Sequence, residues 1–208
     1  MDILYFDEYI AVISKPSGIL SEGKVNDKNT APALISEGLK KRGISVLSVY
    51  PVHRLDRETR GLMVYALTVD AAAELSRAIA DGKLQKQYTA TVHGRPEADT
   101  GEFCDLLFYD RRKNKSFPVK RERQGVKKAR LSYEVLCYDE STDTSSLKIS
   151  LFTGRTHQIR VQFASRKMPL VGDRKYGAPK TDGNAYDLTS SMLSFPHPKT
   201  GEIIQFKI

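Results

Sequence analysis

Short strand-like segments separated by turn residues constrain the fold more than any other feature of this sequence. Residues 61–66 (GLMVYA) form a continuous apolar run, which is typical of a strand covered on both faces. Residues 86–93 (KQYTATVH) alternate as a strand does and end at a Gly-Arg-Pro turn. The same criteria predict further strands at residues 3–6, 10–14, 132–138, 146–152, 192–195 and 203–208, the last two as a hairpin.

Helical patterns are fewer. We predict helices at residues 33–42 and 157–165, and one through Ala80 that is capped by Asp70 and stopped by Gly82. No internal repeat or linker interrupts the chain, so the pattern predicts a single α+β domain spanning residues 1–208.

Composition excludes several protein classes. The 208 residues include only two cysteines, Cys104 and Cys137, without a CxxC pattern, and four scattered histidines, so we expect no disulfide framework, no metal and no cofactor. The longest apolar runs fall well short of a membrane span of roughly 18 residues, and the N-terminal sequence lacks signal-peptide features. A soluble cytoplasmic protein, monomeric by default, is the expectation.

The positive charge is concentrated in one segment, residues 111–130 (RRKNKSFPVKRERQGVKKAR), which we call the basic segment. It holds ten Lys+Arg against one acid, a net +9, while the whole chain carries +8. Such a block stays solvated unless an anion neutralises it. It is either a solvated loop, a polyanion-binding arm or, less readily, a contact for acidic membrane lipid, because it lacks the apolar stripe of an amphipathic helix.

Three polar segments adjoin apolar strands. In residues 53–61 (HRLDRETRG), Asp56 lies between Arg54 and Arg57, which favours its ionised form and suits a nucleophile or an electrostatic partner. A surface salt-bridge cluster is the alternative. Tyr88 lies within a strand, either packed in the core or offering its ring to a nucleobase. Residues 153–161 (TGRTHQIRV) combine a glycine turn with two arginines suited to carboxylate or phosphate.

These segments occur in a familiar order. HRLDRETRGLMVYA, KQYTATVHG, TGRTHQIRV and PLVGDRKYG, preceded by DEYIAVISKPSGIL and followed by FPHPKTGEIIQF, resemble the motifs of the RluA family of pseudouridine synthases. The resemblance covers nearly the whole chain. It implies a largely antiparallel mixed β-sheet with flanking helices and a central RNA-binding cleft, in a compact member without an S4 module.

The resemblance also implies an activity and its residues. The enzyme would isomerise uridine to pseudouridine in RNA without a cofactor, with Asp56 as the catalytic aspartate. Tyr88 would stack on the uracil, and Arg160 would pair with Asp56 and orient it. Ile159 would contribute to an apolar floor, and Arg54 would enter the space left by the extruded nucleotide. Whether the aspartate adds to C1′, adds to C6 or assists a glycal route is left open.

RNA contacts are expected from cations around this site. The predicted set comprises Arg54, Arg57, Arg155, His157, Ile159, Arg111, Arg112, Lys113, Lys120, Arg121, Arg123, Lys127 and Lys128. The basic segment is predicted to be a hairpin or loop that grips RNA over the cleft, and the RNA to be a stem-loop of ribosomal or transfer RNA.

Some positions depart from the family pattern, and other functions compete. Arg60 replaces the usual serine and Gln162 a common histidine, which weakens any transfer of target identity. The alternatives are a catalytically inactive RNA-binding or RNA-folding helper on the same fold, and a basic structural or membrane-surface module.

Overall fold

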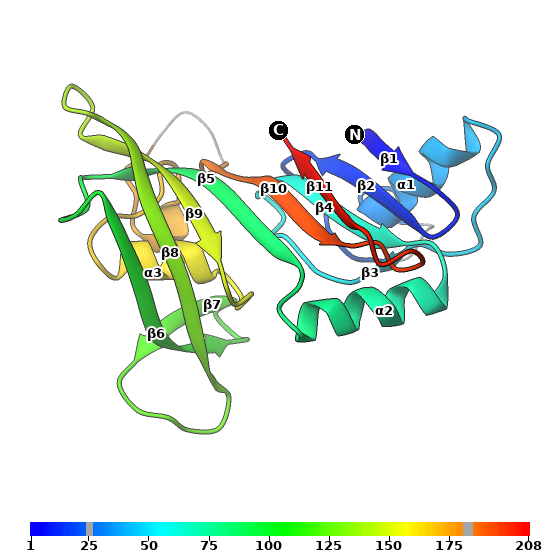
Figure 1. Cartoon of the computed structure of the whole chain (residues 1–208). Coiled ribbons are helices and arrows are strands. Elements are labelled where there is room, and N and C mark those ends of the chain that lie inside the picture. Colours follow the sequence, from blue (N-terminus) through cyan, green and yellow to red (C-terminus); the bar gives the residue numbers. More distant parts are fainter. Residues whose placement is uncertain (24–26, 181–184) are drawn as a thin grey trace. The chain divides into compact units, whose positions relative to one another are not determined.

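The computed structural model describes residues 1–23, 27–180 and 185–208, and it separates the chain into two compact units. The first unit contains residues 1–86 and 189–208, and the second contains residues 87–188 (Figure 1). Both units combine strands with helices, so the predicted α+β class is confirmed.

The first unit is a mixed sheet with two helices. Its elements are β1 (Asp2–Phe6), β2 (Ile10–Lys15), α1 (Ala31–Lys40), β3 (Tyr50–Pro51), β4 (Arg60–Ala66), α2 (Val69–Ala80), most of β10 (Leu188–Pro196) and β11 (Ile203–Lys207). β2 pairs with β1 and β4, and β10 pairs with β11, in antiparallel fashion, whereas β4 and β10 run parallel. The short β3 pairs with β4, and the predicted C-terminal hairpin is confirmed.

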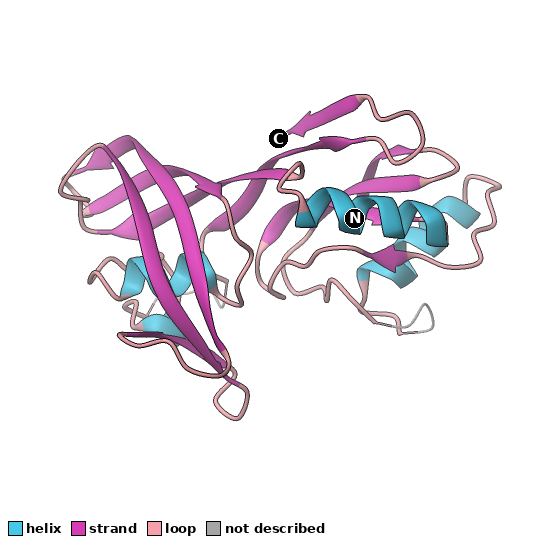
Figure 2. Ribbon diagram, turned by 60° about the horizontal axis from the view of Figure 1, so that its bottom comes forward, coloured by secondary structure: helices cyan, strands magenta, loops and turns pink. Residues whose placement is uncertain are grey.

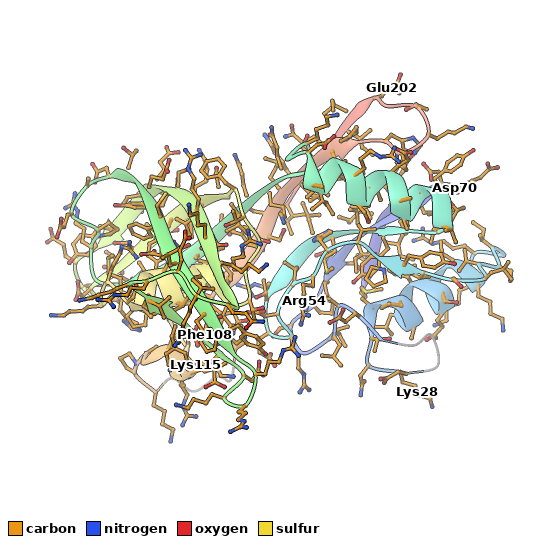
Figure 3. The ribbon with its side chains drawn as sticks, turned by 90° about the horizontal axis from the view of Figure 1, so that it is seen from below. Lys28, Arg54, Asp70, Phe108, Lys115 and Glu202 are labelled. Atoms are coloured by element: carbon orange, nitrogen blue, oxygen red, sulfur yellow. The ribbon has the colours of Figure 1, made fainter. Side chains whose placement is uncertain are left out.

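Strand β4 is the centre of this unit. Six of its seven residues are buried, as predicted for an apolar run covered on both faces. Ala71 and Leu75 of α2 pack on one face, and α1 lies on the other side of the strands (Figure 3). Fully burying a leucine such as Leu75 contributes about 1.5–3 kcal/mol, so these contacts fix β4 and the loop that leads into it.

Both helices begin earlier than the sequence predicts. Thr68, not Asp70, caps α2, because its hydroxyl accepts the Ala71 N–H at 3.1 Å. Asp70 lies in the first turn, where its negative charge interacts favourably with the helix dipole. Thr30 caps α1 in the same way, so this helix starts at Ala31.

The second unit is an antiparallel sheet in the order β5-β9-β8-β6-β7, with α3 against one face (Figure 2). Its elements are β5 (Gln85–His93), β6 (Thr100–Asp110), β7 (Lys115–Val119), β8 (Val126–Asp139), β9 (Thr144–Leu151), α3 (Gln158–Ala164) and the short helix η1 (Arg174–Tyr176). The predicted helix at 157–165 and the strands at 86–93, 132–138 and 146–152 are confirmed.

The basic segment is more ordered than a solvated loop. The segment consists of two turns, the strand β7 that lies between them, and the first residues of β8. We did not predict β6 or β7 from the sequence. Beneath the sheet, Phe103, Tyr133 and Phe163 form an aromatic cluster with ring centroids 5.0–5.8 Å apart, which joins β6 and β8 to α3.

Candidate active site

Asp56 lies in the loop that leads into β4. The backbone N–H of Thr59 donates to the Asp56 carbonyl at 3.0 Å and closes a turn just before the strand begins. The Asp56 side chain is half-buried. A carboxylate is therefore presented at the start of the most deeply buried strand of the first unit.

A buried lysine, Lys15, anchors the loop that contains Asp56. The Lys15 ammonium donates to the carbonyls of Pro16, Ile19 and Arg57 at 2.9–3.0 Å. Burial lowers the pKa of Lys15 to about 8, although the carboxylates of Glu58 and Asp56 favour its charged form. Lys15 therefore ties the β2 end to the Asp56 loop and adds positive charge near the carboxylate.

Further hydrogen bonds join the loop to residues 17–21. The Ser21 hydroxyl donates to the Leu55 carbonyl at 2.8 Å and accepts the Leu55 N–H at 3.0 Å. Gly18 and Arg57 exchange two bonds, from the Gly18 N–H to the Arg57 carbonyl and from Arg57 Nε to the Gly18 carbonyl. These contacts restrain the backbone on both sides of Asp56.

His53 has a structural role in the same motif. Its Nε2 accepts the Val64 N–H at 3.2 Å, so the imidazole is neutral and anchors the loop to β4. Burial lowers the pKa of His53 to about 3, and the nearby Lys86 adds to this effect. His53 therefore does not supply a proton at neutral pH.

The two predicted RNA-binding arginines of this loop are exposed. Arg54 forms an ion pair with Glu22 at 2.9 Å, and Arg57 lies 3.8 Å from Glu58. Exposed pairs of this kind contribute about 0–1 kcal/mol, so a phosphate can replace the carboxylates at little cost. Their contact with RNA stays a prediction.

Tyr88 belongs to the second unit. It lies on β5 opposite Ile149 of β9 and is only 4% exposed. Its strand alternates buried Tyr88, Ala90 and Val92 with less buried neighbours, as the sequence predicts. The ring is therefore rigidly held, and its stacking on uracil stays a prediction.

An ion pair and two aromatic rings hold the Arg160 side chain in the second unit. It lies on α3 and forms a two-pronged ion pair with Asp173, with Nε–Oδ2 2.6 Å and Nη2–Oδ1 2.8 Å. Its guanidinium also lies 4.1 Å from the ring centroid of Tyr186 and 5.1 Å from that of Tyr176. A buried guanidinium needs a carboxylate partner, and Asp173 supplies one.

Sequence reasoning missed Asp173. It lies in the stretch PLVGDRKYG, which we recognised as a motif without giving its acid a role. The predicted pair between Arg160 and Asp56 would join the two units, and it stays a prediction. Lys15 likewise lies in the quoted motif DEYIAVISKPSGIL, and we predicted no role of its own for it from the sequence.

The residues around Arg160 divide into buried and exposed sets. His157 is buried, has a left-handed backbone with φ of 54°, and its Nδ1 lies 3.0 Å from the Tyr176 hydroxyl. Ile159 is buried as well, whereas Arg155 is exposed and donates from Nε to the Lys128 carbonyl at 2.9 Å. Of these three, only Arg155 is open to a large ligand.

The eight predicted cations of the basic segment are all exposed. They are Arg111, Arg112, Lys113, Lys120, Arg121, Arg123, Lys127 and Lys128. Within the described part of the chain, Lys128 alone among them has an acidic partner, Glu122 at 3.4 Å. Arg123 instead lies over the Phe108 ring at 4.9 Å, and Figure 3 labels that ring. The segment therefore offers unneutralised charge.

Metal ligation has no candidate among the described residues, where no three His, Cys, Asp or Glu side chains are grouped to hold an ion. The helices in the same part of the chain are also too short or too polar to cross a membrane.

Comparison with known proteins identifies the family. Residues 9–165 match the sequence model described as RNA pseudouridylate synthase. The chain is 34% identical to the dual-specificity RNA pseudouridine synthase RluA of Escherichia coli, over 99% of this chain and 91% of that protein. The chain belongs to the RluA family of RNA pseudouridine synthases. It is an enzyme that forms pseudouridine in RNA.

Other relatives agree. The uncharacterized RNA pseudouridine synthase YlyB of Bacillus subtilis is 33% identical over 100% of this chain and 68% of its own length. The solved structure of human RNA pseudouridylate synthase domain containing 4 superposes with a TM-score of 0.78 at 23% identity, covering 99% of this chain and 87% of that one. At that identity the structural likeness shows the fold, which is the one expected from the sequence motifs.

Proposed function

We propose that this enzyme converts specific uridines of structured ribosomal or transfer RNA to pseudouridine, with Asp56 as the catalytic carboxylate. The observation that carries the proposal is the way the HRLDRET loop is built. Lys15 anchors it through the Arg57 carbonyl, and Asp56 is presented half-buried beside that cation. Such a loop holds a carboxylate in one place, which the chemistry requires.

The reaction exchanges one bond to the sugar for another. The C1′–N1 bond breaks, the base turns, C1′ bonds to C5, the C5 proton leaves, and N1 takes up a proton, so that the product is an isomer of the substrate. An ionised Asp56 supplies the electron pair or the charge for the first step, by addition to C1′, by addition to C6 or by assisting loss of the 2′ proton. Tyr88 stacks on the base and assists removal of the C5 proton, while Arg160 pairs with Asp56.

The RNA partner is inferred from charge and from a relative. The exposed cations of the basic segment suit a phosphate backbone, and each phosphate contact adds about 0.7–0.9 to the slope of log affinity against log salt. The dual specificity in the name of the Escherichia coli relative supports a stem-loop present in more than one RNA class. We propose that the basic segment grips that stem-loop.

Release of tritium from RNA labelled at uracil C5 tests the catalytic assignment. Cellular ribosomal and transfer RNA from a strain lacking this protein is the substrate. Asp56→Asn is expected to abolish release, because the amide cannot act as the anion. The matched control is Asp70→Asn, an exposed acid on α2 (Figure 3), which is expected to retain full activity. An active Asp56→Asn protein would remove the assignment, and RNA binding without turnover by the wild type would favour the helper function.

The salt dependence of RNA affinity tests the proposed contact between the basic segment and the RNA. Replacing Arg111, Arg112 and Arg121 with Gln is expected to reduce the salt slope by roughly two to three. An unchanged slope would show that the basic segment does not meet phosphates.

A further inference from the structure

A small hollow in the second unit has the lining of a nucleotide site. Its volume is about 160 Å³, which corresponds to roughly five water molecules at about 30 Å³ each and leaves room for one planar ring, so a phosphate attached to that ring would lie at the exposed cations of the lining. Its lining includes Leu107, Tyr109, Ser116, Lys127, Arg155 and Thr156. It contains neither Asp56 nor Tyr88 nor Arg160, and is therefore distinct from the candidate catalytic residues.

The register of the sheet builds one wall. Tyr109 of β6 lies opposite Ser116 of β7, and Leu107 of β6 lies opposite Lys127 of β8. Because side chains alternate between the two faces of a strand, these four project to the same face. Lys128, the next residue of β8, points to the other face and pairs there with Glu122.

The loop before α3 builds the other wall, and two hydrogen bonds hold it against the sheet. The Ser116 hydroxyl donates to the Thr156 carbonyl at 2.6 Å, and Arg155 Nε donates to the Lys128 carbonyl at 2.9 Å. The hollow is therefore shaped before any ligand arrives. Among the described residues, nothing bonds to the two terminal nitrogens of the Arg155 guanidinium, which can therefore bind an anion.

The chemistry of the lining selects the ligand. Lys127 and Arg155 are exposed cations, and the described residues provide neither with a carboxylate. Beside the polar Ser116 and Thr156, the lining also includes Leu107, which is buried, and the half-buried ring of Tyr109. Two cations beside an aromatic ring match a phosphate attached to a flat base, where stacking contributes about 1–3 kcal/mol per base.

We propose that this hollow binds one unpaired nucleotide of the RNA other than the uridine that reacts. Its phosphate lies on Lys127 and Arg155, and its base packs against Tyr109. The proposal rests on the RNA-modifying function above and adds a second point at which the enzyme reads its substrate. An RNA loop with a base free to enter the hollow is then a better substrate than one whose neighbouring bases are all paired.

Binding of small probes to the ¹⁵N-labelled full-length protein tests the proposal by NMR. The probes are uridine 5′-monophosphate, uridine and inorganic phosphate. We expect the monophosphate to shift the amide signals of residues 125–127 and 154–156 with saturation, at an affinity at least tenfold above that of either fragment. Equal affinity for phosphate alone would overturn the nucleotide assignment, and so would an absence of shifts at these amides.

Variants locate the effect. Lys127→Gln combined with Arg155→Gln is expected to remove the shifts, and Tyr109→Leu to reduce the monophosphate affinity to that of phosphate. The matched control is Lys207→Gln, an exposed cation on β11 of the first unit, which should bind as the wild type does. Shifts that persist in the double variant would refute the site. Tritium release is measured with the same wild-type preparation. If the protein releases tritium but shows no nucleotide binding at the hollow, only the subsite proposal fails; if it releases no tritium, the proposed function fails.

Discussion

Removing the Asp173 carboxylate is expected to destabilise the second unit strongly. The side chains of Arg160 and Asp173 are only 7% and 1% exposed, and two hydrogen bonds of 2.6 and 2.8 Å join them. Asp173→Ala leaves the guanidinium buried without this carboxylate. Breaking such a pair from one side costs about 3–5 kcal/mol.

The aromatic rings around Arg160 place the expected cost at the lower end of this range. Tyr186 lies 4.1 Å from the guanidinium carbon, and a cation over a ring keeps about 0.5–2 kcal/mol of stabilisation. We therefore expect a loss of about 3 kcal/mol in the free energy of unfolding. For a chain of this size that corresponds to a fall in Tm of roughly 6–12 °C.

Urea denaturation followed by circular dichroism measures the loss. Asp99→Ala is the matched control, because Asp99 pairs with Arg95 at 3.4 Å but is 74% exposed, and its loss should cost less than about 1 kcal/mol. Combining Asp173→Ala with Arg160→Met should recover much of the loss, since the double variant no longer buries a guanidinium without the Asp173 carboxylate. A cost of Asp173→Ala below 1 kcal/mol, or strict additivity in the double variant, would refute the reasoning.

Three other changes test separate features. Burial lowers the pKa of Lys15 to about 8, so between pH 8 and 10 the unfolded chain binds more protons than the native one. The free energy of unfolding of the wild type, measured by urea titration, should therefore rise relative to that of Lys15→Met across that range, and a constant difference would contradict this. Burial raises the pKa of Asp7, but hydrogen bonds, that from the Tyr9 N–H first among them, outweigh burial and hold the pKa below its usual value. The ionised carboxylate therefore stabilises the fold at neutral pH, and this stabilisation is lost in acid. In Asp7→Asn the free energy of unfolding should fall less steeply as the pH is lowered. Gly61→Ala should prevent folding, as judged by circular dichroism, because φ is +107° and a Cβ would collide with the Ser190 carbonyl. Gly201→Ala, at φ +75° with no neighbour near the added Cβ, should lower the free energy of unfolding by about 1 kcal/mol. Equal effects of the two substitutions would refute the argument from steric collision.

The parts of the fold that sequence reasoning predicted are those specified by local pattern. The run 61–66 is apolar at every position that β4 buries, and residues 86–93 alternate as β5 does. The cap of α2 was predicted wrongly because Thr68 and Asp70 are both good capping residues, and only the hydrogen bond to Ala71 distinguishes them.

Strand β6 and the partner of Arg160 depend on tertiary structure. Consecutive apolar residues at 106–108 blur the alternation of β6, which becomes regular only through its pairing with β8. Asp173 lies thirteen residues beyond Arg160 along the chain, and no local spacing rule connects a helix to a loop at that distance. The motifs identified Asp56, Tyr88 and Arg160 as candidates, but Lys15, which anchors the Asp56 loop, and Asp173, which pairs with Arg160, are brought to them only by the tertiary fold.

The division of the chain has a consequence for synthesis on the ribosome. β4 begins beside β10, with Arg60 and Gly61 paired to Thr189 and Ser190, yet the whole second unit is encoded between the two strands. Residues 189–208 are translated after the second unit, so at about 5–20 residues per second that unit is complete roughly one to four seconds before residue 208 is added. Until then the start of β4 lacks its β10 neighbour, and a chain truncated before residue 189 would leave that part of the edge open to aggregation.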